Sequence, residues 1–582
     1  MLVCTQSRPA PILNEALHIE PAERFAIAKK KGGTISERML FLAVVITLGV
    51  LATSVSASDA ELLIQTTLGP VKGSITERGV RLWAGLPYAE PPVGNLRWTY
   101  PQPPKPTTEV YDASYVAPGC QQDCQLPPGN CPEQVSEDCL YLSVTAPPEP
   151  STDGNGYPVF FWIHGGAFEQ GSGNSPLYDG TTFATQGVIT VVVNYRLGVL
   201  GFMASESMQG NYGLMDQRLA LQWVNDNIAA FGGDPKRITI GGQSAGGMSV
   251  GAHLTMPGSK GLFAQSVMES NCLGMPYHTR ESATKNANSA FEYLKCDNDD
   301  VSCMRSKSAE EILDAQANSV KMDRKTLFIN FLPFAPLVEY GGELPLQPLD
   351  AMASGQMAQV PMLSGTVLSE GQLFVYELFT SKLSKTKYHA ALDTIFGWHN
   401  AKKVKKMYPF DIVPGSKDGR EAFNVLATDL IFGCPLRNVT RGYQNALGLS
   451  AIPTYQYRLD HVMSFDCWGP QYSFCVDVVC HGSELPFVFN TFAGGNDPDG
   501  NPVSYNPTAD EKALAADVGG AWANFITTGN PNKGAQSVPM EFKPYSAASG
   551  GDVVILDEPA WSEGSNERSE FCDMWDSLGY FY

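Results

Sequence analysis

One pentapeptide of the sequence has the residue types and the setting of a nucleophile. Residues 242–246 read Gly-Gln-Ser-Ala-Gly, with Ser244 at the centre. They follow the strand-like residues 237–241 and precede residues 247–254, which can open a helix. In such a strand-turn-helix a serine sits in a strained turn with its hydroxyl exposed, which is the geometry of a nucleophile elbow. Because the pentapeptide alone occurs by chance in many proteins, this context is what predicts a nucleophilic serine.

A reactive serine also needs a base for its proton and N–H donors for the oxyanion that forms. Residues 162–168 read Trp-Ile-His-Gly-Gly-Ala-Phe and follow a run typical of a buried strand. The small residues Gly166 and Ala167 allow backbone N–H groups to turn toward a carbonyl oxygen. We therefore expect the amides of Gly166, Ala167 and Ala245 to form an oxyanion hole. A plain glycine turn between a strand and a loop is the alternative.

Strands and helices must alternate to position these two motifs. Residues 159–163 and 188–193 are nearly continuous β-branched and aromatic runs, typical of strands buried on both faces of a parallel sheet. Residues 214–231 place apolar side chains at helical spacing. A chain that alternates strand and helix in this way is expected to form a doubly wound α/β core.

Further motifs resemble those of a known family. They are residues 87–94 (PYAEPPVG), 136–142 (SEDCLYL) and 231–235 (FGGDP). From about Leu62 to the C-terminus, the chain resembles the type B carboxylesterase family, which includes cholinesterases and fungal lipases. The resemblance implies an α/β-hydrolase fold, with a large, mostly parallel central sheet and helices on both faces. No linker or internal repeat divides the chain, so we expect one catalytic domain over residues 58–582 and an N-terminal extension at residues 1–57.

The resemblance also implies the partners of Ser244. The acid is Glu370, in the sequence Leu-Ser-Glu-Gly, and the base is His481, in Cys-His-Gly-Ser-Glu-Leu-Pro-Phe. The order Ser, Glu, His along the chain is that of α/β-hydrolases and supports this assignment independently. Among the 8 histidines, His461 is the second candidate for the base.

Structural roles follow from the same resemblance. It implies two ion pairs, Arg97 with Glu137 and Arg196 with Asp216, and pairing would explain charges in apolar surroundings. Twelve of the 13 cysteines follow the N-terminal extension at residues 1–57. This even number favours disulfides. The resemblance suggests the pairs Cys120–Cys139, Cys296–Cys303 and Cys434–Cys572. Cys124 and Cys131 can close within the first loop. Three pairings of the other four cysteines exist, of which Cys467–Cys475 with Cys272–Cys480 is the one we expect.

The N-terminal region predicts export from the cell. Residues 39–52 are an uncharged apolar run with basic residues before it and a small-residue site ending at Ala57. The run is shorter than the roughly 20 residues that span a bilayer, so it predicts a signal peptide cleaved after Ala57. A retained signal anchor is the alternative, and translation could begin at Met1 or at Met39. The sequon at Asn438 predicts N-glycosylation of a secreted protein without a stable membrane anchor.

The net charge and the composition of one loop restrict the classes of ligand that the sequence predicts. The formal net charge of −20 disfavours nucleic acid as a partner and is expected to repel anionic lipid headgroups. The loop from Cys120 to Cys139 is proline-rich and has no aromatic residue to face a cation, which disfavours a choline ester. Gln243 stands where cholinesterases carry Glu, and this difference also disfavours a choline ester. The short loop also favours a small ester over emulsified lipid.

The resulting prediction is a secreted serine esterase that acts on a small-molecule carboxylic ester. A triad and an oxyanion hole supply the acid–base and electrostatic contributions, so neither a metal nor an organic cofactor is expected. Two alternatives remain. The protein could be a lipase acting on longer-chain lipid esters, or a non-catalytic, cholinesterase-like adhesion or binding protein.

Overall fold

The computed structural model describes residues 62–581, apart from residues 152–153, 322–327, 448–451, 497–501, 547–550 and 565–567. These described residues belong to one unit, residues 57–582. The predicted signal peptide, its cleavage after Ala57 and the choice between Met1 and Met39 lie outside the described residues.

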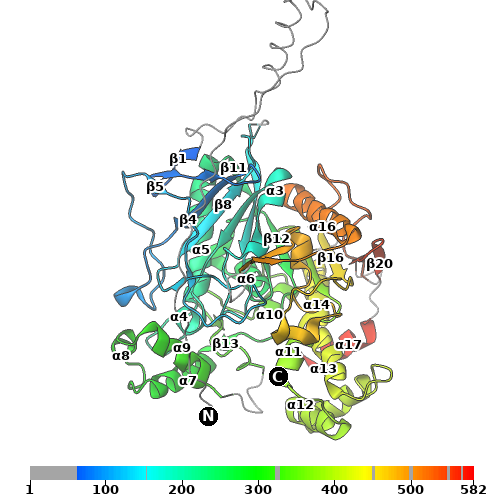
Figure 1. The fold of residues 1–582 in the computed structure, drawn as a ribbon. Coiled ribbons are helices and arrows are strands. Elements are labelled where there is room, and N and C mark those ends of the chain that lie inside the picture. The colour runs from blue at the N-terminus through cyan, green and yellow to red at the C-terminus, as the bar shows by residue number, and fades with distance from the viewer. Residues whose placement is uncertain are drawn as a thin grey trace, which may run out of the picture. The chain divides into compact units, whose positions relative to one another are not determined.

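A large mixed sheet forms the centre of the molecule (Figure 1). Eleven strands of the described chain make it, in the order β20-β19-β16-β15-β12-β11-β9-β10-β8-β4-β3. The strands from β19 to β10 run parallel, whereas β20, β8, β4 and β3 form antiparallel pairs at the two edges. Their bounds are β3 Ser74–Ile75, β4 Arg81–Pro87, β8 Tyr141–Ala146, β9 Tyr157–Ile163, β10 Ile189–Val193, β11 Gly233–Gln243, β12 Gln265–Glu269, β15 Met362–Val367, β16 Thr454–Leu459, β19 Val553–Leu556 and β20 Ser562–Gly564.

Helices cover both faces of this sheet, which explains the nearly continuous apolar sequence of β9. Phe160 and Trp162 belong to one buried cluster, which also includes side chains of α3 (Thr181–Thr185) and α16 (Ala509–Thr528). Val159, Phe161 and Ile163 alternate with them and belong to a second cluster, with α5 (Tyr212–Asn227) and α6 (Ala245–Thr255). Because successive strand side chains point to opposite faces, both faces must be apolar. The predicted doubly wound core is therefore present.

Helices are more abundant than strands beyond residue 280, and α7 to α9 and α12 lie in the lower part of Figure 1. No helix of the described residues is both long enough and apolar enough to cross a bilayer. The bounds of these helices are α7 Arg280–Tyr293, α8 Val301–Arg305, α9 Ala309–Asn318, α10 Pro348–Ala353, α11 Gly371–Leu378, α12 Lys385–Met407, α13 Gly419–Ala427, η5 Thr428–Gly433, α14 Cys434–Leu447 and α17 Ser569–Leu578.

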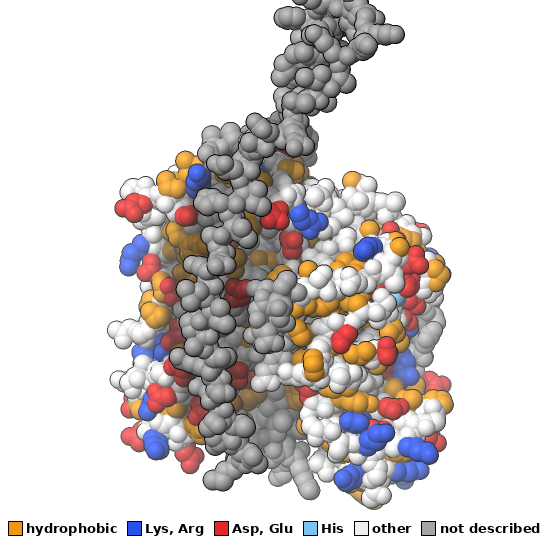
Figure 2. Space-filling model, in the orientation of Figure 1, with side chains coloured by type: hydrophobic (Ala, Val, Ile, Leu, Met, Phe, Trp, Pro, Cys, Tyr) orange, Lys and Arg blue, Asp and Glu red, His pale blue; other side chains and the backbone are white. Residues whose placement is uncertain are grey.

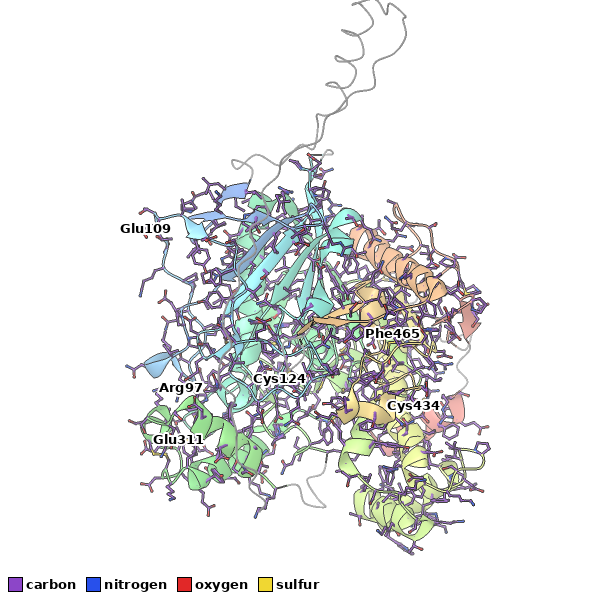
Figure 3. All side chains as sticks on the ribbon, viewed as in Figure 1. Arg97, Glu109, Cys124, Glu311, Cys434 and Phe465 are labelled. Atoms are coloured by element: carbon purple, nitrogen blue, oxygen red, sulfur yellow. A yellow bond between two sulfur atoms is a disulfide. The ribbon has the colours of Figure 1, made fainter. Side chains whose placement is uncertain are left out.

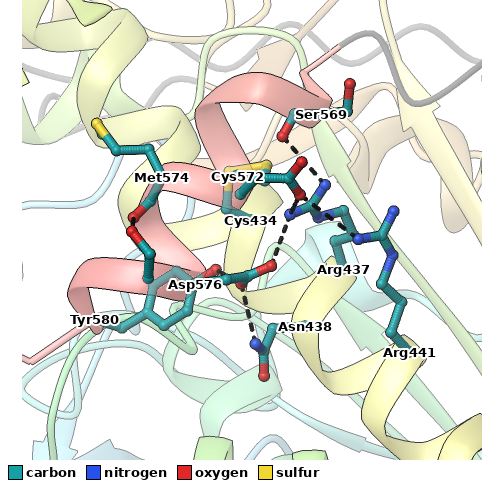
Figure 4. A network of polar contacts seen from close by, with 11 residues as sticks. Cys434, Arg437, Asn438, Arg441, Ser569, Cys572, Met574, Asp576 and Tyr580 are labelled. Carbon is teal, nitrogen blue, oxygen red and sulfur yellow. Dashed lines mark hydrogen bonds and ion pairs between the residues drawn. A yellow bond between two sulfur atoms is a disulfide. The ribbon is translucent and has the colours of Figure 1, made fainter.

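Four of the predicted disulfides are present. They are Cys120–Cys139, Cys124–Cys131, Cys296–Cys303 and Cys434–Cys572. The last joins α14 to α17, beside the pairing of Arg437 with Asp576 (Figure 4).

The expected pairs Cys467–Cys475 and Cys272–Cys480 are wrong. Cys475 is instead bonded to Cys480, because the short turn between them brings their Cα atoms to 5.5 Å, within the span that a disulfide requires. Cys272 and Cys467 are the free cysteines of the described residues. Cys272 is buried just after β12, and the Cys467 sulfur lies 4.0 Å from the sulfur of Met463.

Both predicted ion pairs are confirmed. Arg196 donates to Asp216 from Nε at 2.8 Å and from Nη2 at 2.7 Å, and both side chains are buried. Arg97 donates from Nε to Glu137 at 2.7 Å, and from Nη1 to the carbonyl of Lys307 at 2.8 Å. Arg97 thus ties the N-terminal strand region to the segment that leads into α9 (Figure 3).

Candidate active site

Ser244 occupies the sharp turn between β11 and α6. Its φ and ψ of 57° and −123° are outside the regions that a non-glycine residue normally adopts. A β-carbon on Gly242 would lie 2.5 Å from the backbone of Gly246, and one on Gly246 would lie 2.0 Å from the carbonyl oxygen of Ile163. Only glycine fits at these two positions, so the motif residues permit the close packing that keeps Ser244 in a strained conformation.

Glu370 and His481 meet through a short hydrogen bond. The Nδ1 atom of His481 lies 2.6 Å from Oε2 of Glu370, and both side chains are buried. The other carboxylate oxygen of Glu370 accepts from the amide of Val367 at 2.9 Å. A carboxylate can only accept, so Nδ1 carries the proton and Nε2 keeps a lone pair that is able to take a proton.

The backbones that carry these two residues are joined directly. Ser369 and Cys480, their preceding neighbours, form a parallel β-bridge, and the Ser369 amide donates to the carbonyl of Val479 at 3.0 Å. The Cys475–Cys480 disulfide further restrains the segment just before His481. The relative position of acid and base is therefore set by main-chain contacts as well as by their own hydrogen bond.

The His481 ring is held between two phenylalanines. Its centroid lies 5.0 Å from that of Phe374 and 5.2 Å from that of Phe432. On the open side, the side-chain amide nitrogen of Gln243 lies 3.3 Å from Nε2. Gln243 therefore approaches the same nitrogen that would take a proton from Ser244.

The loop after β9 has an unusual backbone conformation. Gly166, Ala167 and Phe168 have successive positive φ values of 105°, 59° and 61°. A β-carbon on Gly166 would lie 2.1 Å from the carbonyl oxygen of Gln170, so glycine is required there.

One cavity of about 200 Å³ is lined by four of the six residues predicted for the triad and the oxyanion hole, whereas Glu370 and Ala245 are not among its lining residues. Ser244, His481, Gly166 and Ala167 all line it. The aromatic residues absent from the Cys120–Cys139 loop are supplied from elsewhere in the chain, while that loop contributes aliphatic side chains. Other residues lining the cavity include Leu126, Pro127, Tyr178, Phe331, Phe374, Trp468, Tyr472 and Tyr505.

The other candidate base has a different environment. Nε2 of His461 lies 3.2 Å from the buried carboxylate of Glu511, and its ring packs edge-on against Phe487. His461 is not among the residues that line the cavity. His164, in the glycine-rich loop, stacks on Tyr195, and burial lowers the pKa of His164 to about 4.

Several residues near the site were not singled out from the sequence. Glu269 and Glu484 are both fully buried, and burial is the largest cause of a raised pKa for each, followed by nearby carboxylates. The indole of Trp522 donates to Glu269 at 2.7 Å, and the hydroxyl of Ser270 donates to Glu484 at 2.9 Å. Burial likewise raises the pKa of the Cys272 thiol, which hydrogen-bonds with Ser244. No local motif indicates such contacts between distant segments.

Known proteins with related sequences share this architecture. The profile of the Carboxylesterase family matches residues 60–575. The chain is 39% identical to the cAMP-regulated D2 protein of Dictyostelium discoideum, over 86% of this chain and 89% of that protein. It is 37% identical to the para-nitrobenzyl esterase of Bacillus subtilis strain 168, over 89% of this chain and 99% of that protein.

A solved structure of a PNB esterase superposes on the chain with a TM-score of 0.73 and 34% identity, covering 88% of this chain and 99% of the esterase. This likeness confirms the predicted α/β-hydrolase fold. The chain belongs to the carboxylesterase family, and it is a carboxylic-ester hydrolase.

Proposed function

We propose that the protein is a secreted serine esterase that hydrolyses small carboxylic esters through an acyl-enzyme on Ser244. The observation that carries the proposal is the 2.6 Å contact between Glu370 and Nδ1 of His481, together with the cavity that both His481 and Ser244 line. The order of events then follows from the chemistry of these groups.

In the first half-reaction, Nε2 of His481 takes the Ser244 hydroxyl proton while the serine oxygen attacks the ester carbonyl. The negative oxygen that forms is stabilised by the amides of Gly166, Ala167 and Ala245. When the carbon–oxygen bond breaks, His481 returns its proton to the leaving alcohol. Water then repeats the sequence on the acyl-enzyme, releasing the acid and restoring the Ser244 hydroxyl. Glu370 keeps the imidazole in the productive tautomer and offsets its transient positive charge.

The restrained loop at one wall of the cavity favours a small ester over a lipid droplet. The loop from Cys120 to Cys139 is held closed by two disulfides. It is also tied down by hydrogen bonds, since the Gln125 amide donates to the side chain of Gln170 and the Tyr472 hydroxyl donates to the Gln125 carbonyl, both at 2.7 Å. A loop restrained in this way is poorly suited to act as a lid that opens at an oil surface.

The proposal is tested by labelling with a fluorophosphonate and by turnover of a short-chain p-nitrophenyl ester. Ser244→Ala should abolish both, because no other hydroxyl is placed in the elbow. Ser354→Ala, which alters an exposed serine just after α10, should retain the wild-type rate. Absence of labelling of the wild-type protein would favour the non-catalytic binding function. A rate that rises sharply when the substrate forms an interface would favour a lipase.

Export and glycosylation are part of the proposal. Five disulfides within the described residues are typical of proteins that mature in an oxidising compartment. Asn438 is half-buried on α14, and its amide donates to Asp576 at 3.0 Å (Figure 4). A glycan added before folding would occupy that amide. Enzymatic removal of N-glycans should lower the mass of the secreted protein, and Asn438→Gln should remove the difference.

A further inference from the structure

The charge of the chain is distributed unevenly, and one helix is rich in lysine. The formal net charge is −20, yet residues 382–417 contain eight lysines and two aspartates. In the space-filling view, Lys and Arg side chains gather at the lower right, where Figure 1 places α12 (Figure 2). The exposed lysines of this segment are Lys382, Lys385, Lys387, Lys402, Lys403, Lys406 and Lys417.

α12 is bent back on itself at a glycine. Gly397 has φ and ψ of 69° and 154°, which interrupts the helix between Lys385 and Met407. The Lys405 ammonium lies 2.5 Å from the carboxylate of Asp393, twelve positions earlier. In a straight helix these residues would be about 18 Å apart along the axis, beyond the reach of their side chains. The two halves therefore form a helical hairpin, which we call the α12 hairpin (residues 385–407).

The residue at the tip of the α12 hairpin is an exposed tryptophan. Trp398 is 86% exposed, an unusual state for the largest apolar side chain. Lys402 and Lys406 follow it at spacings of four and eight residues, which places all three on one face of the second half of the hairpin. Ala401 and Val404 occupy the opposite, buried face.

This arrangement of charge does not stabilise the fold. Lys402 and Lys406 are like charges one helical turn apart, which is unfavourable. Lys385 and Lys387 lie in the first turn, where there is no acidic residue and the helix dipole disfavours positive charge. Within the described residues, Lys402, Lys403 and Lys406 make no ion pair; Lys405, in contrast, is paired with Asp393.

An anionic bilayer surface has the two properties that complement this face. Tryptophan rings favour the headgroup level of a bilayer, and lysines next to such a ring bind anionic headgroups. An acidic protein partner would complement the lysines, but it would not by itself account for the exposed indole. We propose that the α12 hairpin docks this protein reversibly on an anionic lipid bilayer, through Trp398, Lys402 and Lys406.

The proposal refines the expectation that the net charge repels anionic lipid. The rest of the surface would still be repelled, so docking would occur in one orientation and would weaken with salt. It does not depend on the proposed catalysis, because binding is measured without substrate.

The test is sedimentation of the full chain with vesicles of phosphatidylcholine, with and without 30% phosphatidylserine, at about 50 mM salt. We expect binding to the anionic vesicles that is lost in about 0.5 M salt. The apolar run at residues 39–52, if it is not cleaved, would bind both vesicle types alike. The difference in binding between the two vesicle types therefore isolates the electrostatic contribution.

Matched variants locate the contact. Each lysine near an anionic surface contributes about fivefold to partitioning, so Lys402→Gln with Lys406→Gln should weaken binding about 25-fold. Lys236→Gln with Lys260→Gln, two exposed lysines elsewhere, removes the same charge and should change binding less than twofold. Trp398→Ala should weaken binding about tenfold.

Brominated lipids give a second measurement that needs no charge variant. They should quench part of the wild-type tryptophan fluorescence, and Trp398→Phe should lose that quenching. Equal binding of the two double-lysine variants would overturn the proposal. Retention on a heparin column without sedimentation on vesicles would also overturn it and would identify an acidic polysaccharide as the partner.

Discussion

The side-chain nitrogen of Gln243 lies 3.3 Å from Nε2 of His481, on the side of the imidazole that faces the catalytic cavity. Since Glu370 accepts from Nδ1, Nε2 is the acceptor in this contact and Gln243 is the donor. A neutral amide thus occupies the position next to the nitrogen that receives the serine proton in the proposed mechanism.

Gln243→Glu should raise the pH at which activity appears. A carboxylate beside the ring would favour the protonated imidazole, and an opposite charge at this distance shifts such an equilibrium by about one to two pH units. The acid limb of the kcat/KM profile should move upward by that amount.

Gln243→Leu is the control for this change. It removes the hydrogen bond without adding charge, so its acid limb should stay within a few tenths of a unit of the wild type. Identical profiles for Gln243→Glu and the wild type would show that the side chain is not beside the working base.

Glu370→Gln should lower kcat by about 10³- to 10⁴-fold, with little change in KM. The new amide would present an N–H to Nδ1 of His481, which favours the tautomer with its proton on Nε2 and removes the proton acceptor. The protein should still fold, because the amide oxygen can accept from Val367. Single-turnover kinetics together with the thermal unfolding midpoint would measure both effects, and a loss of less than tenfold would contradict the role of Glu370.

Peptide mapping without reduction should recover Cys475 and Cys480 within one bridged peptide. Alkylation in denaturant should modify Cys272 and Cys467 and no other cysteine of the described residues. In the native protein Cys467 should react faster, because Cys272 is buried beneath the nucleophile. A peptide joining Cys272 to Cys480 would contradict the structure.

The buried pair Glu269 and Glu484 should make stability fall as pH rises. Their folded-state pKa values are raised above the usual 4.5, and that of Glu484 to about 7. At a pH between the usual pKa and the raised folded-state pKa, the folded state binds more protons than the unfolded state. The free energy of unfolding therefore decreases as the pH rises. Each such group contributes a slope of up to about 1.4 kcal/mol per pH unit.

Glu484→Gln should therefore flatten the dependence of the thermal midpoint on pH between about 5 and 7. The comparison with the wild type at a fixed scan rate removes the contribution of other titrating groups. An unchanged difference in midpoint between pH 5.5 and pH 7 would show that Glu484 is not protonated in the folded state.

Much of the fold could be predicted because its signals are local. The apolar run of β9 and the glycines around Ser244 depend on residues within one strand or one turn. The positive φ of Ser244 agrees with the strained turn expected from its place in the pentapeptide. Four disulfides were also expected correctly, three from resemblance and one from the short loop that it closes.

The environment of the predicted residues was not available from such patterns. Glu370 and His481 are 111 residues apart, and their contact depends on the bridge between Ser369 and Cys480. Cys480 was expected to pair with Cys272, but the turn that follows η6 (Pro470–Cys475) brings it to Cys475. No periodicity in the sequence reports a turn of that kind.

The sequence by itself determined the α/β sheet, the serine elbow and the glycine-rich loop, because each depends on the side-chain pattern and backbone conformation of a few consecutive residues. The tertiary structure alone decided that Gln243 faces His481, that two carboxylates are buried together and that Trp398 stands at the tip of a lysine-rich hairpin. The first two are contacts between segments that are distant along the chain, and their free energies depend on packing that no local pattern encodes. The third depends on the bend at Gly397, which the helical spacing of the residues around it does not reveal.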